Sequence, residues 1–540
     1  MGKWQTKEQL VELLTALVEH PSMTNSEGEV AIAEYVHKQL SDLPYFKEHP
    51  EHVTLHPLSD GRRFVTALAK SKADVQDTII LISHFDVVEV DDYGSWKSLA
   101  FRPKELTEEF YNNKQLVPEQ VKKDMENGEW FFGRGTMDMK AGLTLQMSML
   151  EKACNGEFDG NVLLVTVPDE EANSAGMIGA VPVLLELAKK YNLSYRACLN
   201  SEPSFARYPG DANPYVYTGS IGKALPGFFC FGKETHVGEP FAGLNAAYMA
   251  AEVSRSLELN TDFCENIDGE TTPPPTALMQ RDLKEEYSVQ IPHSANVMYN
   301  VMMMERTMEE MTALLLNSAK KAATSIEEKF IQSARSFASM QSSYEPTEFN
   351  VKVLTYDELL AYAKKKHGEE EIERRLNYVT SHRGDLGDRD FTVKLVQNLA
   401  SLCRELAPCI VLYYSPPYYP AVSSRNDDYI KRMSQWAMDY TKENYAIDLK
   451  NQHYFAGLSD LSFVRLEESE DSLSPLIGNM PMFDRGYNLP VKELRELNIP
   501  VMNLGPFGRD AHQWTERLEM EFSFEKLPDI LERTITEMLK

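Results

Sequence analysis

The strongest constraint on the fold comes from three short apolar runs. They are Thr78–Ser83, Asn161–Val167 and Arg196–Asn200. Strands that are buried on both faces have such runs of Val, Ile and Leu, because helices cover both sides of a parallel sheet. A helical pattern separates the second run from the third, and a strand–helix–strand order implies parallel pairing. The sequence therefore predicts an α/β fold with a mixed, mostly parallel sheet.

Potential metal ligands follow each of these runs. His84 and Asp86 come directly after the first run, Glu170 and Glu171 after the second, and Glu202 after the third. Open α/β sheets place their functional sites at the carboxyl ends of the strands. We therefore expect these acidic and imidazole groups to gather at one edge of the sheet.

A glycine-containing stretch, Phe131–Leu143, adds another carboxylate. Gly133 and Gly135 allow a tight turn with positive φ, and this turn delivers Asp138 to the start of an apolar helix. A single carboxylate held in this way suggests a metal ligand. His512, near the end of the chain, is a further candidate ligand.

The types of these side chains indicate the metal. The candidate ligands are His84, Asp138, Glu171, Glu202 and His512, and none is a thiolate. Nitrogen and oxygen ligands suit a hard or borderline divalent ion, with zinc the first choice and cobalt or manganese as alternatives. Two ions would balance the charge, because three carboxylates and one bridging hydroxide supply four negative charges. A solvated acidic rim is the alternative interpretation, but it does not explain why the ligand types follow buried strands.

The composition narrows the class of partner. Lys and Arg number 55 against 82 Asp and Glu, which gives a formal net charge of −27. This charge repels nucleic-acid phosphates and anionic membranes, and no apolar run approaches the roughly 18 to 20 residues that cross a bilayer. The six cysteines include no C-x-x-C pair, which fits neither a disulfide framework nor a thiolate zinc site. We expect a soluble, cytoplasmic protein whose partners are neither nucleic acid nor membrane.

A different pattern begins near Thr218, where strand, helix, strand and helix signals follow one another among scattered glycines. This pattern indicates an inserted α+β domain. Charged helical segments are predicted between residues 356 and 406, and the first domain is expected to resume with the strand Cys409–Tyr414. The predicted division assigns 1–220 and 406–540 to the catalytic domain and 221–405 to the insertion.

Two helices are predicted before the sheet. Thr6 with Gln9, and Ser26 with Glu29, have the spacing of capping boxes, in which two side chains satisfy backbone N–H groups at a helix start. The stretch Asp91–Glu129 is interpreted as a long loop that is functional or decorates an edge.

The motifs, in their order along the chain, resemble those of the M20 metallopeptidases and aminoacylases, in particular the RocB-type members linked to arginine catabolism. They are HFDVV at 84–88, GRGTMDMKAG at 133–142, PDEEANSAG at 168–176, SEP at 201–203 and GPFGRDAHQWTE at 505–516. The resemblance covers most of the chain. It implies a zinc-exopeptidase-like catalytic domain interrupted by a ferredoxin-like lid, through which two subunits form a homodimer.

The resemblance also implies a role for each ligand. His84 and Glu202 would be terminal ligands of opposite metals, together with Glu171 and His512. Asp138 would bridge the two metals. This arrangement assigns all of the candidate ligands to one dinuclear site.

Two further residues of the same motifs receive roles from the resemblance. Asp86 would orient His84, and Glu170 would be the general base that takes a proton from the metal-bridging water. Adjacent residues of an extended backbone point in opposite directions, so Glu171 can bind metal while Glu170 faces the substrate.

Two segments resemble the substrate-binding parts of the same family. GKETHVGEPFAGLNAA at 232–247 resembles the lid signature, which marks His236 as a polariser of the scissile carbonyl. HYFAGLSDLSF at 453–463 resembles the glycine-rich substrate loop. The lid signature implies that His236 works on the metal site of the partner subunit.

The expected protein is a dinuclear zinc amidohydrolase that cleaves a short peptide or an N-acyl amino acid, with a link to arginine and ornithine catabolism. Peptidase and deacylase activity remain alternatives. A catalytically silent binding or sensing protein is the rival from another class. The presence of all candidate ligands and of Glu170 counts against this rival, because a decayed site should have lost at least one of them.

Overall fold

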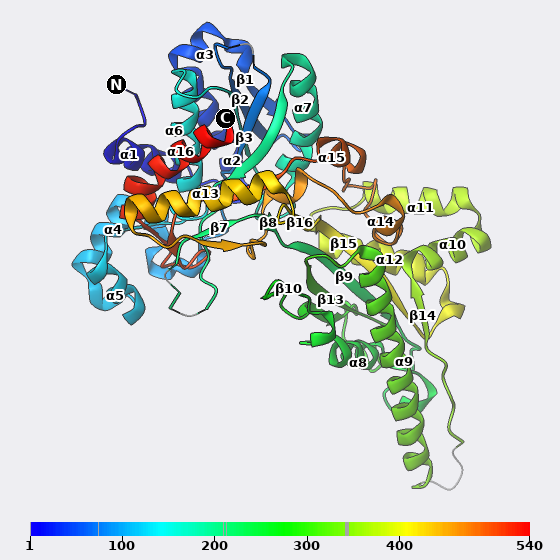
Figure 1. Cartoon of the computed structure of the whole chain (residues 1–540). Coiled ribbons are helices and arrows are strands. Elements are labelled where there is room, and N and C mark those ends of the chain that lie inside the picture. The colour runs from blue at the N-terminus through cyan, green and yellow to red at the C-terminus, as the bar shows by residue number, and fades with distance from the viewer. Residues whose placement is uncertain (1, 74, 209, 212, 341–344) are drawn as a thin grey trace. The chain divides into compact units, whose positions relative to one another are not determined.

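The computed structural model describes residues 2–73, 75–208, 210–211, 213–340 and 345–540 (Figure 1). The chain divides into two compact units, each with its own large sheet. The first unit contains Met1–Ile221, Pro420–Glu467 and Pro490–Lys540, and the second contains Gly222–Tyr419 and Glu468–Leu489.

An eight-stranded sheet forms the centre of the first unit, in the order β1-β2-β5-β3-β6-β18-β7-β17. Its strands are β1 (Val53–Pro57), β2 (Arg63–Ala69), β3 (Asp77–His84), β5 (Asn161–Val167), β6 (Ser194–Asn200), β7 (Tyr215–Tyr217), β17 (Lys450–Gln452) and β18 (Val501–Leu504). The central strands β5, β3, β6 and β18 run parallel, whereas β1, β2 and β7 pair antiparallel with a neighbour. The predicted α/β fold with a mixed, mostly parallel sheet is confirmed.

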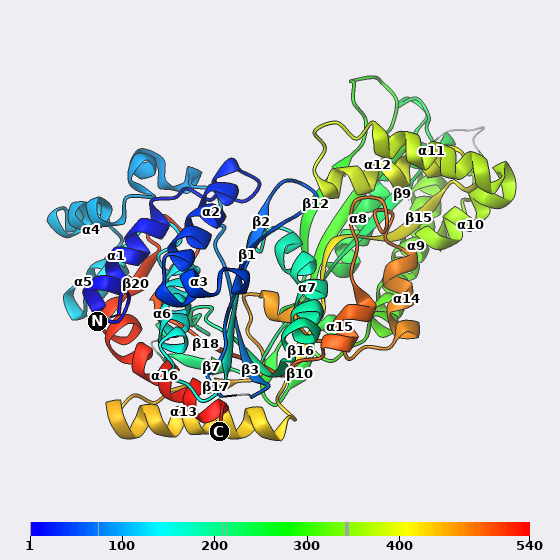
Figure 2. The ribbon, with the colours of Figure 1, turned by 90° about the horizontal axis from the view of Figure 1, so that it is seen from above.

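Helices cover both faces of this sheet. One hydrophobic core joins it to α1 (Lys7–Val18), α2 (Glu27–Ser41), α3 (Pro44–Glu48), α6 (Lys140–Cys154), α13 (Asp428–Tyr445) and α16 (Leu527–Met538). Figure 2 shows α7 (Ala175–Tyr191) on the opposite side of the strands from α6. Every residue of β5 is buried, which explains why its sequence has no polar alternation.

The two predicted capping boxes have different outcomes. At α1, Thr6 and Gln9 form the predicted reciprocal pair. At α2, Ser26 accepts a hydrogen bond from a backbone N–H, but Glu29 does not complete a box. Glu29 is buried and its carboxylate accepts instead from the backbone N–H groups of Asn25 and Asp169, so the second box was predicted wrongly.

The stretch that was interpreted as a long loop is largely helical. It contains η2 (Asp91–Leu99), α4 (Pro103–Asn112), η3 (Lys114–Leu116) and α5 (Glu119–Asn127). These elements have a small core of their own that includes Tyr93, Leu106, Phe110 and Val121. A three-stranded sheet beside them joins β4 (Trp130–Phe132) to β20 (Arg517–Glu519) and β19 (Gly508–Arg509), and so brings distant parts of the sequence together.

The second unit is an α+β structure around a five-stranded sheet, in the order β12-β13-β9-β15-β14. Its strands are β9 (Gly222–Phe231), β12 (Thr276–Asp282), β13 (Ser294–Met303), β14 (Lys352–Thr355) and β15 (Cys409–Tyr419). Its helices are α8 (Ala246–Leu257), α9 (Met308–Ala338), α10 (Tyr356–His367), α11 (Glu369–Ser381), α12 (Asp388–Ser401) and α14 (Glu470–Gly478). The helical character predicted after residue 356 is confirmed.

The strand β15 belongs to this second sheet, where it pairs antiparallel with β9 and parallel with β14. The prediction that this strand resumes the first domain's sheet is therefore wrong. All of its residues are buried, and a buried apolar run has the same sequence character in either sheet. The chain returns to the first unit at Pro420 and enters the second unit once more at Glu468–Leu489.

Short elements complete both units. They are η1 (Pro50–His52), β8 (Gly219–Ser220), η4 (Pro240–Ala242), η5 (Thr261–Phe263), β10 (Asn266–Ile267), β11 (Glu270–Thr271), η6 (Arg404–Leu406), β16 (Val422–Ser423), η7 (Asp460–Phe463), α15 (Val491–Leu497) and η8 (Phe522–Lys526). Among the described residues, no helix is both long and apolar enough to cross a membrane.

Candidate metal centre

The ends of three parallel strands bring the predicted ligands together in the first unit. His84 is the last residue of β3 and pairs with Val167, the last residue of β5. Glu170 and Glu171 follow β5, and Glu202 follows β6. Asp138 precedes α6, and His512 lies between β19 and β20.

The distances divide the ligands into two groups. His84 Nε2 lies 3.4 Å from Asp138 Oδ1 and 3.5 Å from Glu202 Oε1. His512 Nε2 lies 3.3 Å from Asp138 Oδ2 and 3.0 Å from Glu171 Oε1. Asp138 thus presents one oxygen to each histidine. His84 and Glu202 fall in the same group, which differs from their predicted assignment to opposite metals.

These separations match those of metal ligands. Zinc bonds of about 2.0–2.1 Å place the ligand atoms of a tetrahedral site about 3.4 Å apart. The distances of 3.4 and 3.5 Å around His84, and of 3.3 and 3.0 Å around His512, lie close to this value. His84, Asp138 and Glu171 also offer ligand atoms that lie within 4.8 Å of one another. The donor set fits two divalent ions that share Asp138.

The orientation of His84 suits this use. Its Nδ1 lies 3.0 Å from the backbone oxygen of Asp86, to which it can donate a hydrogen bond. The proton then lies on Nδ1, and the lone pair of Nε2 faces Asp138 and Glu202. The main chain of Asp86 makes this contact, while its carboxylate lies farther away, with Oδ1 3.5 Å from Nδ1.

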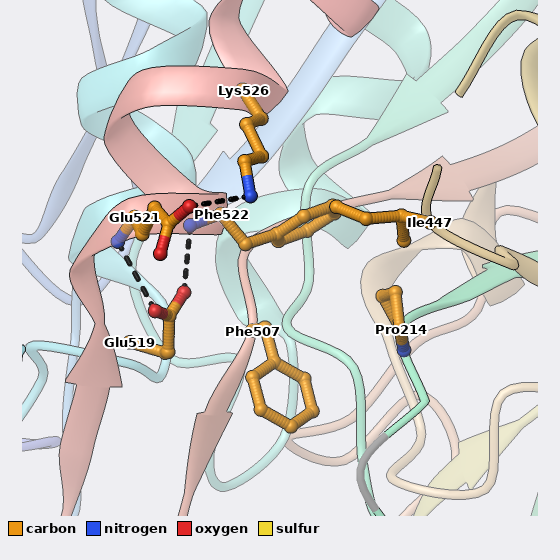
Figure 3. A pocket seen from close by; sticks show the side chains of 7 residues that line it. All are labelled: Pro214, Ile447, Phe507, Glu519, Glu521, Phe522 and Lys526. Atoms are coloured by element: carbon orange, nitrogen blue, oxygen red, sulfur yellow. Dashed lines mark hydrogen bonds and ion pairs between the residues drawn. The ribbon is translucent and has the colours of Figure 1, made fainter. Parts of the chain in front are cut away.

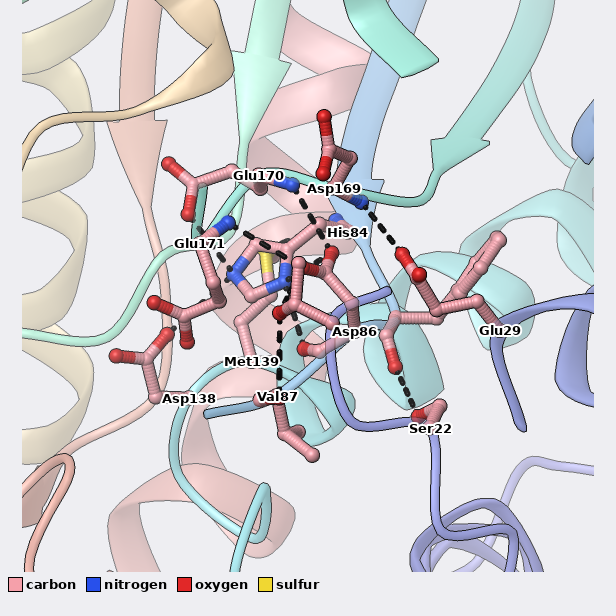
Figure 4. Close-up of polar contacts among 12 residues, drawn as sticks. Ser22, Glu29, His84, Asp86, Val87, Asp138, Met139, Asp169, Glu170 and Glu171 are labelled. Atoms are coloured by element: carbon pink, nitrogen blue, oxygen red, sulfur yellow. Dashed lines mark hydrogen bonds and ion pairs between the residues drawn. The ribbon is translucent and has the colours of Figure 1, made fainter. Parts of the chain in front are cut away.

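The Asp86 carboxylate holds the turn that carries the two glutamates. Its Oδ1 accepts a hydrogen bond from the Glu170 N–H at 3.1 Å, and its Oδ2 accepts one from the Glu171 N–H at 3.2 Å (Figure 4). The preceding residue, Asp169, has a left-handed φ of 71°. The two glutamates therefore lie in a turn and not in the extended backbone that was predicted. Their side chains still diverge, because Glu170 Oε2 lies 3.8 Å from His84 Nε2 whereas Glu171 contacts His512.

Four carboxylates with little exposure to water converge at this site, those of Asp138, Glu170, Glu171 and Glu202. Burial, together with nearby acids, raises the pKa of Glu170 and of Glu202 well above the ordinary value. At His512, burial opposes the charged form, but hydrogen bonds with Asp138 and Glu171 raise the pKa to about 11. Buried anions are costly unless cations compensate for them. Divalent ions would supply that compensation.

Glu516 holds the backbone of the turn that ends in Asp138. The sequence interpretation did not assign this role to Glu516. Its Oε1 accepts hydrogen bonds from the N–H groups of Gly135, Met137 and Asp138, at 2.8, 3.2 and 3.3 Å. Its Oε2 lies 2.8 Å from the guanidinium of buried Arg134. The only sequence signal for this role is that Glu516 ends the motif that contains His512.

A second supporting network was also missed. Arg62 forms ion pairs with Asp169 and Glu29, and Glu29 Oε1 accepts a hydrogen bond from the Asp169 N–H at 2.9 Å. The Asp169 carboxylate accepts from the Ala175 N–H at the start of α7. Burial raises the pKa of Glu29 to about 8, although Arg62 opposes this shift. The network connects α2, α7 and the glutamate turn.

The loop predicted to bind substrate contributes one buried carboxylate. Asp460 is 2% exposed, and burial raises its pKa to about 7. Its negative charge also adds to the rise in the pKa of Glu170, after the larger effect of burial. This part of the loop therefore lies near the acidic site within the first unit.

His236 lies in the second unit, in an exposed segment between β9 and α8. The Gly238 N–H donates a hydrogen bond to His236 Nδ1 at 3.1 Å. In the neutral ring the proton must then lie on Nε2, which becomes a hydrogen-bond donor. The predicted action of His236 on a substrate carbonyl stays a prediction.

A pocket of about 210 Å³ lies elsewhere in the first unit (Figure 3). Its lining residues are Pro214, Ile447, Phe507, Glu519, Glu521, Phe522 and Lys526. Glu519 accepts hydrogen bonds from the backbone N–H groups of Glu521 and Phe522, and Lys526 pairs with Glu521. The charged side chains of this pocket thus have partners within its own lining. None of the predicted metal ligands lines the pocket.

Comparisons with known proteins agree with the geometry. The family model "Peptidase family M20/M25/M40" matches residues 80–469. The chain is 55% identical to YqjN of Bacillus subtilis (strain 168) over 537 residues, which cover 99% of this chain and 97% of the relative. It is 30% identical to Protein RocB of the same strain over 541 residues, which cover 98% of this chain and 95% of the relative.

The fold is also similar to solved structures. The M20 family metallo-carboxypeptidase Sso-CP2 from Sulfolobus solfataricus matches with a TM-score of 0.54 and 12% identity, over 98% of this chain and 99% of that one. At this identity the likeness concerns the fold alone. The family model matches most of the chain, and YqjN and RocB align with it over nearly its full length at 55% and 30% identity. These matches show that this chain belongs to the M20 peptidase family.

Proposed function

We propose that this M20-family hydrolase uses two zinc ions to cleave an amide bond in a short peptide or an N-acyl amino acid. One observation carries the proposal. Asp138 turns its two oxygens to two different histidines, and each histidine has a glutamate of its own at ligand spacing, Glu202 for His84 and Glu171 for His512. A structural ion-pair network would not require this twofold arrangement.

The ligands that would hold the ions are His84, Glu202 and Asp138 for one, and His512, Glu171 and Asp138 for the other. Two ions in these positions would supply Lewis-acid chemistry, which makes water a nucleophile near neutral pH and polarises an amide carbonyl. Cobalt or manganese suits the same nitrogen and oxygen ligands. The chain's own residues then have to orient the substrate and move protons.

We assign the proton transfer to Glu170. It lies beside His84 but outside both ligand groups, and its backbone is fixed by Asp86. As a general base it would take a proton from the attacking water and pass it to the leaving amine. Asp86 therefore serves both functions at once, because its main chain orients His84 and its carboxylate fixes the base.

His236 would assist at the carbonyl oxygen. With its proton on Nε2, it can donate a hydrogen bond to the oxyanion that forms when the amide is attacked. We place this action in a homodimer that forms through the second unit, where His236 serves the partner's site. The ligands named above and Glu170 all belong to the first unit, so the donor comes from the other compact unit of the chain.

The proposed substrate class rests on resemblance. The motifs resemble those of RocB-type M20 members linked to arginine catabolism, and the chain is 30% identical to RocB over nearly its full length. We therefore propose arginine and ornithine derivatives as substrates, whether dipeptides or N-acyl compounds. All of the cysteines are free, which supports a reducing, cytoplasmic location. They are Cys154, Cys198, Cys230, Cys264, Cys403 and Cys409. A silent binding protein is the second candidate, but the complete ligand set and Glu170 favour the enzyme.

A hydrolysis screen joined to metal analysis tests the proposal. The wild type and Glu170→Gln are purified with supplemented zinc and assayed on dipeptides and N-acyl amino acids, arginine and ornithine derivatives included. Loss of a general base costs about 10² to 10⁴ in rate, so Glu170→Gln should retain its zinc and lose turnover. The matched control, Glu171→Gln, should lose zinc. Near-normal turnover by Glu170→Gln would move the base elsewhere.

A further inference from the structure

A second cluster of metal-competent side chains lies in the first unit, directly before β1. His49, Glu51 and His52 lie in and beside the short 3-10 helix η1. One potential ligand atom from each side chain lies within 4.8 Å of the other two. We propose that these three side chains form a surface site for one divalent transition-metal ion, with Zn²⁺ the natural choice for two imidazoles and a carboxylate.

The strand register separates this cluster from the acidic site. His84 pairs with Val167 at the carboxyl end of β5. Ala69, the last residue of β2, pairs with Val162 at the other end of β5. β1 begins at that same end, because it pairs antiparallel with β2 and its first residue, Val53, lies opposite Ala67. The segment 49–52 precedes β1, so it lies at the amino-terminal edge of the parallel strands, opposite the edge that carries His84.

One oxygen of Glu51 lies within reach of both rings. Its Oε1 is 3.8 Å from His49 Nδ1 and 3.6 Å from His52 Nε2. The ligand atoms of a tetrahedral zinc site are about 3.4 Å apart. A movement of about half an ångström or less would close both gaps. The side chains of His49 and Glu51 can make it, because they are 45% and 54% exposed.

His52 is already held in place. Its side chain is 8% exposed, and its Nδ1 lies 2.9 Å from the Tyr45 hydroxyl. That hydroxyl also accepts a hydrogen bond from the Lys70 N–H at 2.9 Å. A tyrosine oxygen has room for two such donors, so Nδ1 of His52 can donate to it and leave the lone pair of Nε2 directed toward Glu51. An outer partner on one ring nitrogen is the arrangement that orients metal-binding histidines.

The remaining contacts fix the backbone around the cluster. The Tyr191 hydroxyl donates a hydrogen bond to the backbone oxygen of Glu51 at 2.9 Å, and its ring packs edge-on against His52 with centroids 5.0 Å apart. The rings of His49 and His52 stack, with centroids 5.2 Å apart and an angle of 18° between their planes. Because an imidazole lone pair lies in its ring plane, the exposed ring of His49 has to turn out of this stack to share an ion with His52.

The charge states also suit a metal. Burial lowers the pKa of His52 even though the Glu51 carboxylate opposes this shift. The backbone N–H of Glu51 lowers the pKa of its own carboxyl group. Both shifts favour the forms that bind a metal, which are the neutral imidazole and the ionised carboxylate. The net charge of −27 adds a general attraction for cations.

Equilibrium dialysis against Zn²⁺, with the metal counted by mass spectrometry, tests the site in the full chain. The wild type is compared with His49→Ala and Glu51→Gln at a series of free Zn²⁺ concentrations. His367→Ala is the control, because it removes an exposed histidine from the second unit. The wild type and the control should each bind one more Zn²⁺ per chain than His49→Ala. Glu51→Gln should weaken that ion about tenfold or more, because a neutral amide replaces the only anionic ligand.

Cu²⁺ gives an independent reading, since electron paramagnetic resonance should show coupling to one imidazole nitrogen fewer in His49→Ala than in the wild type. Equal Zn²⁺ counts and affinities in wild type, His49→Ala and Glu51→Gln would overturn the proposal. If His49→Ala fails to fold, Glu51→Gln alone decides, because its side chain is exposed. The measured quantity is a difference between variants, so the result does not depend on how the acidic site is occupied. The hydrolytic activity of these variants should match that of the wild type.

Discussion

Glu516 offers the sharpest test of how the chain builds the proposed metal centre. The residue is fully buried, and one of its oxygens accepts hydrogen bonds from three backbone N–H groups of the turn that ends in Asp138. The other oxygen pairs with Arg134. Replacement of Glu516 by Ala removes the acceptor of three backbone N–H groups and one of the two carboxylate partners of Arg134, which keeps Asp92. Breaking a buried ion pair costs at most about 3–5 kcal/mol. That is a large part of the roughly 5–15 kcal/mol by which a typical protein is stable.

The same change should weaken metal binding, because the turn would no longer hold Asp138 between the two histidines. Loss of an outer partner of a metal ligand typically lowers affinity about 10- to 100-fold. Glu516→Gln should be milder than Glu516→Ala, since its amide oxygen can still accept from the backbone N–H groups. Thermal unfolding measures the stability of each variant. Zinc titration against a competing chelator measures the affinity.

The matched control for this experiment is Glu519→Gln. Glu519 also accepts hydrogen bonds from two backbone N–H groups, those of Glu521 and Phe522, but it contacts neither Asp138 nor Arg134. Glu519→Gln should therefore leave zinc affinity unchanged. The reasoning is refuted if Glu516→Ala folds and binds zinc as tightly as the wild type. It is refuted equally if Glu519→Gln lowers the affinity by the same factor.

Two further predictions concern single residues. His84→Ala and His512→Ala should each bind less zinc than the wild type. Added zinc should also raise their thermal stability less, because an ion that binds only the folded state stabilises that state. Unchanged zinc content in both variants would count against the site. Burial raises the pKa of Glu29 to about 8 from an ordinary 4.5, so the folded protein keeps a proton that the unfolded chain loses, and the stability contributed by Glu29 falls as pH rises between these values. The melting temperature of the wild type should therefore decline relative to that of Glu29→Gln from about pH 5 to pH 8, and a parallel pH dependence of the two would contradict this assignment.

The parts of the fold that could be predicted from sequence are those with a local signal. The runs that became β3, β5 and β6 are uniformly apolar, and their flanking residues placed His84, Glu171 and Glu202 at one edge of the sheet. Gly133 and Gly135 indicated the turn before Asp138, and their φ values in the structure are 154° and 82°. In each case a few neighbouring residues determine the local conformation.

The wrong predictions concern interactions between distant residues. Cys409–Tyr419 is as apolar as a strand of the first unit, and nothing in it specifies β9 as its partner. Glu29 has the spacing of a capping residue, yet a buried contact with Asp169 some 140 positions away takes its carboxylate. The supporting role of Glu516 could not be predicted from sequence either. Its carboxylate accepts hydrogen bonds from main-chain N–H groups, and every residue except proline carries such a group.

The turn at Glu170 and Glu171 shows the same limit at the site itself. The expectation that the two side chains diverge was right in effect but rested on extended backbone. The structure achieves the divergence with a left-handed Asp169 and with the Asp86 carboxylate, which accepts from both glutamate N–H groups. Asp86 was expected to orient His84, and its nearest contact with the Nδ1 of that ring is the main-chain oxygen.

The proposed action of His236 across a dimer can be decided by complementation. Donors to an oxyanion are worth about 10² to 10³ in kcat, so His236→Ala should be severely impaired and still bind zinc. If His236 serves the partner's site, a mixed dimer of Glu170→Gln and His236→Ala has one site with both lesions and one with neither. Random exchange makes half of the dimers mixed, so roughly a quarter of wild-type activity should return. If His236 serves its own site, every site in the mixture carries a lesion. Demonstrated subunit exchange without recovered activity would therefore exclude action in trans.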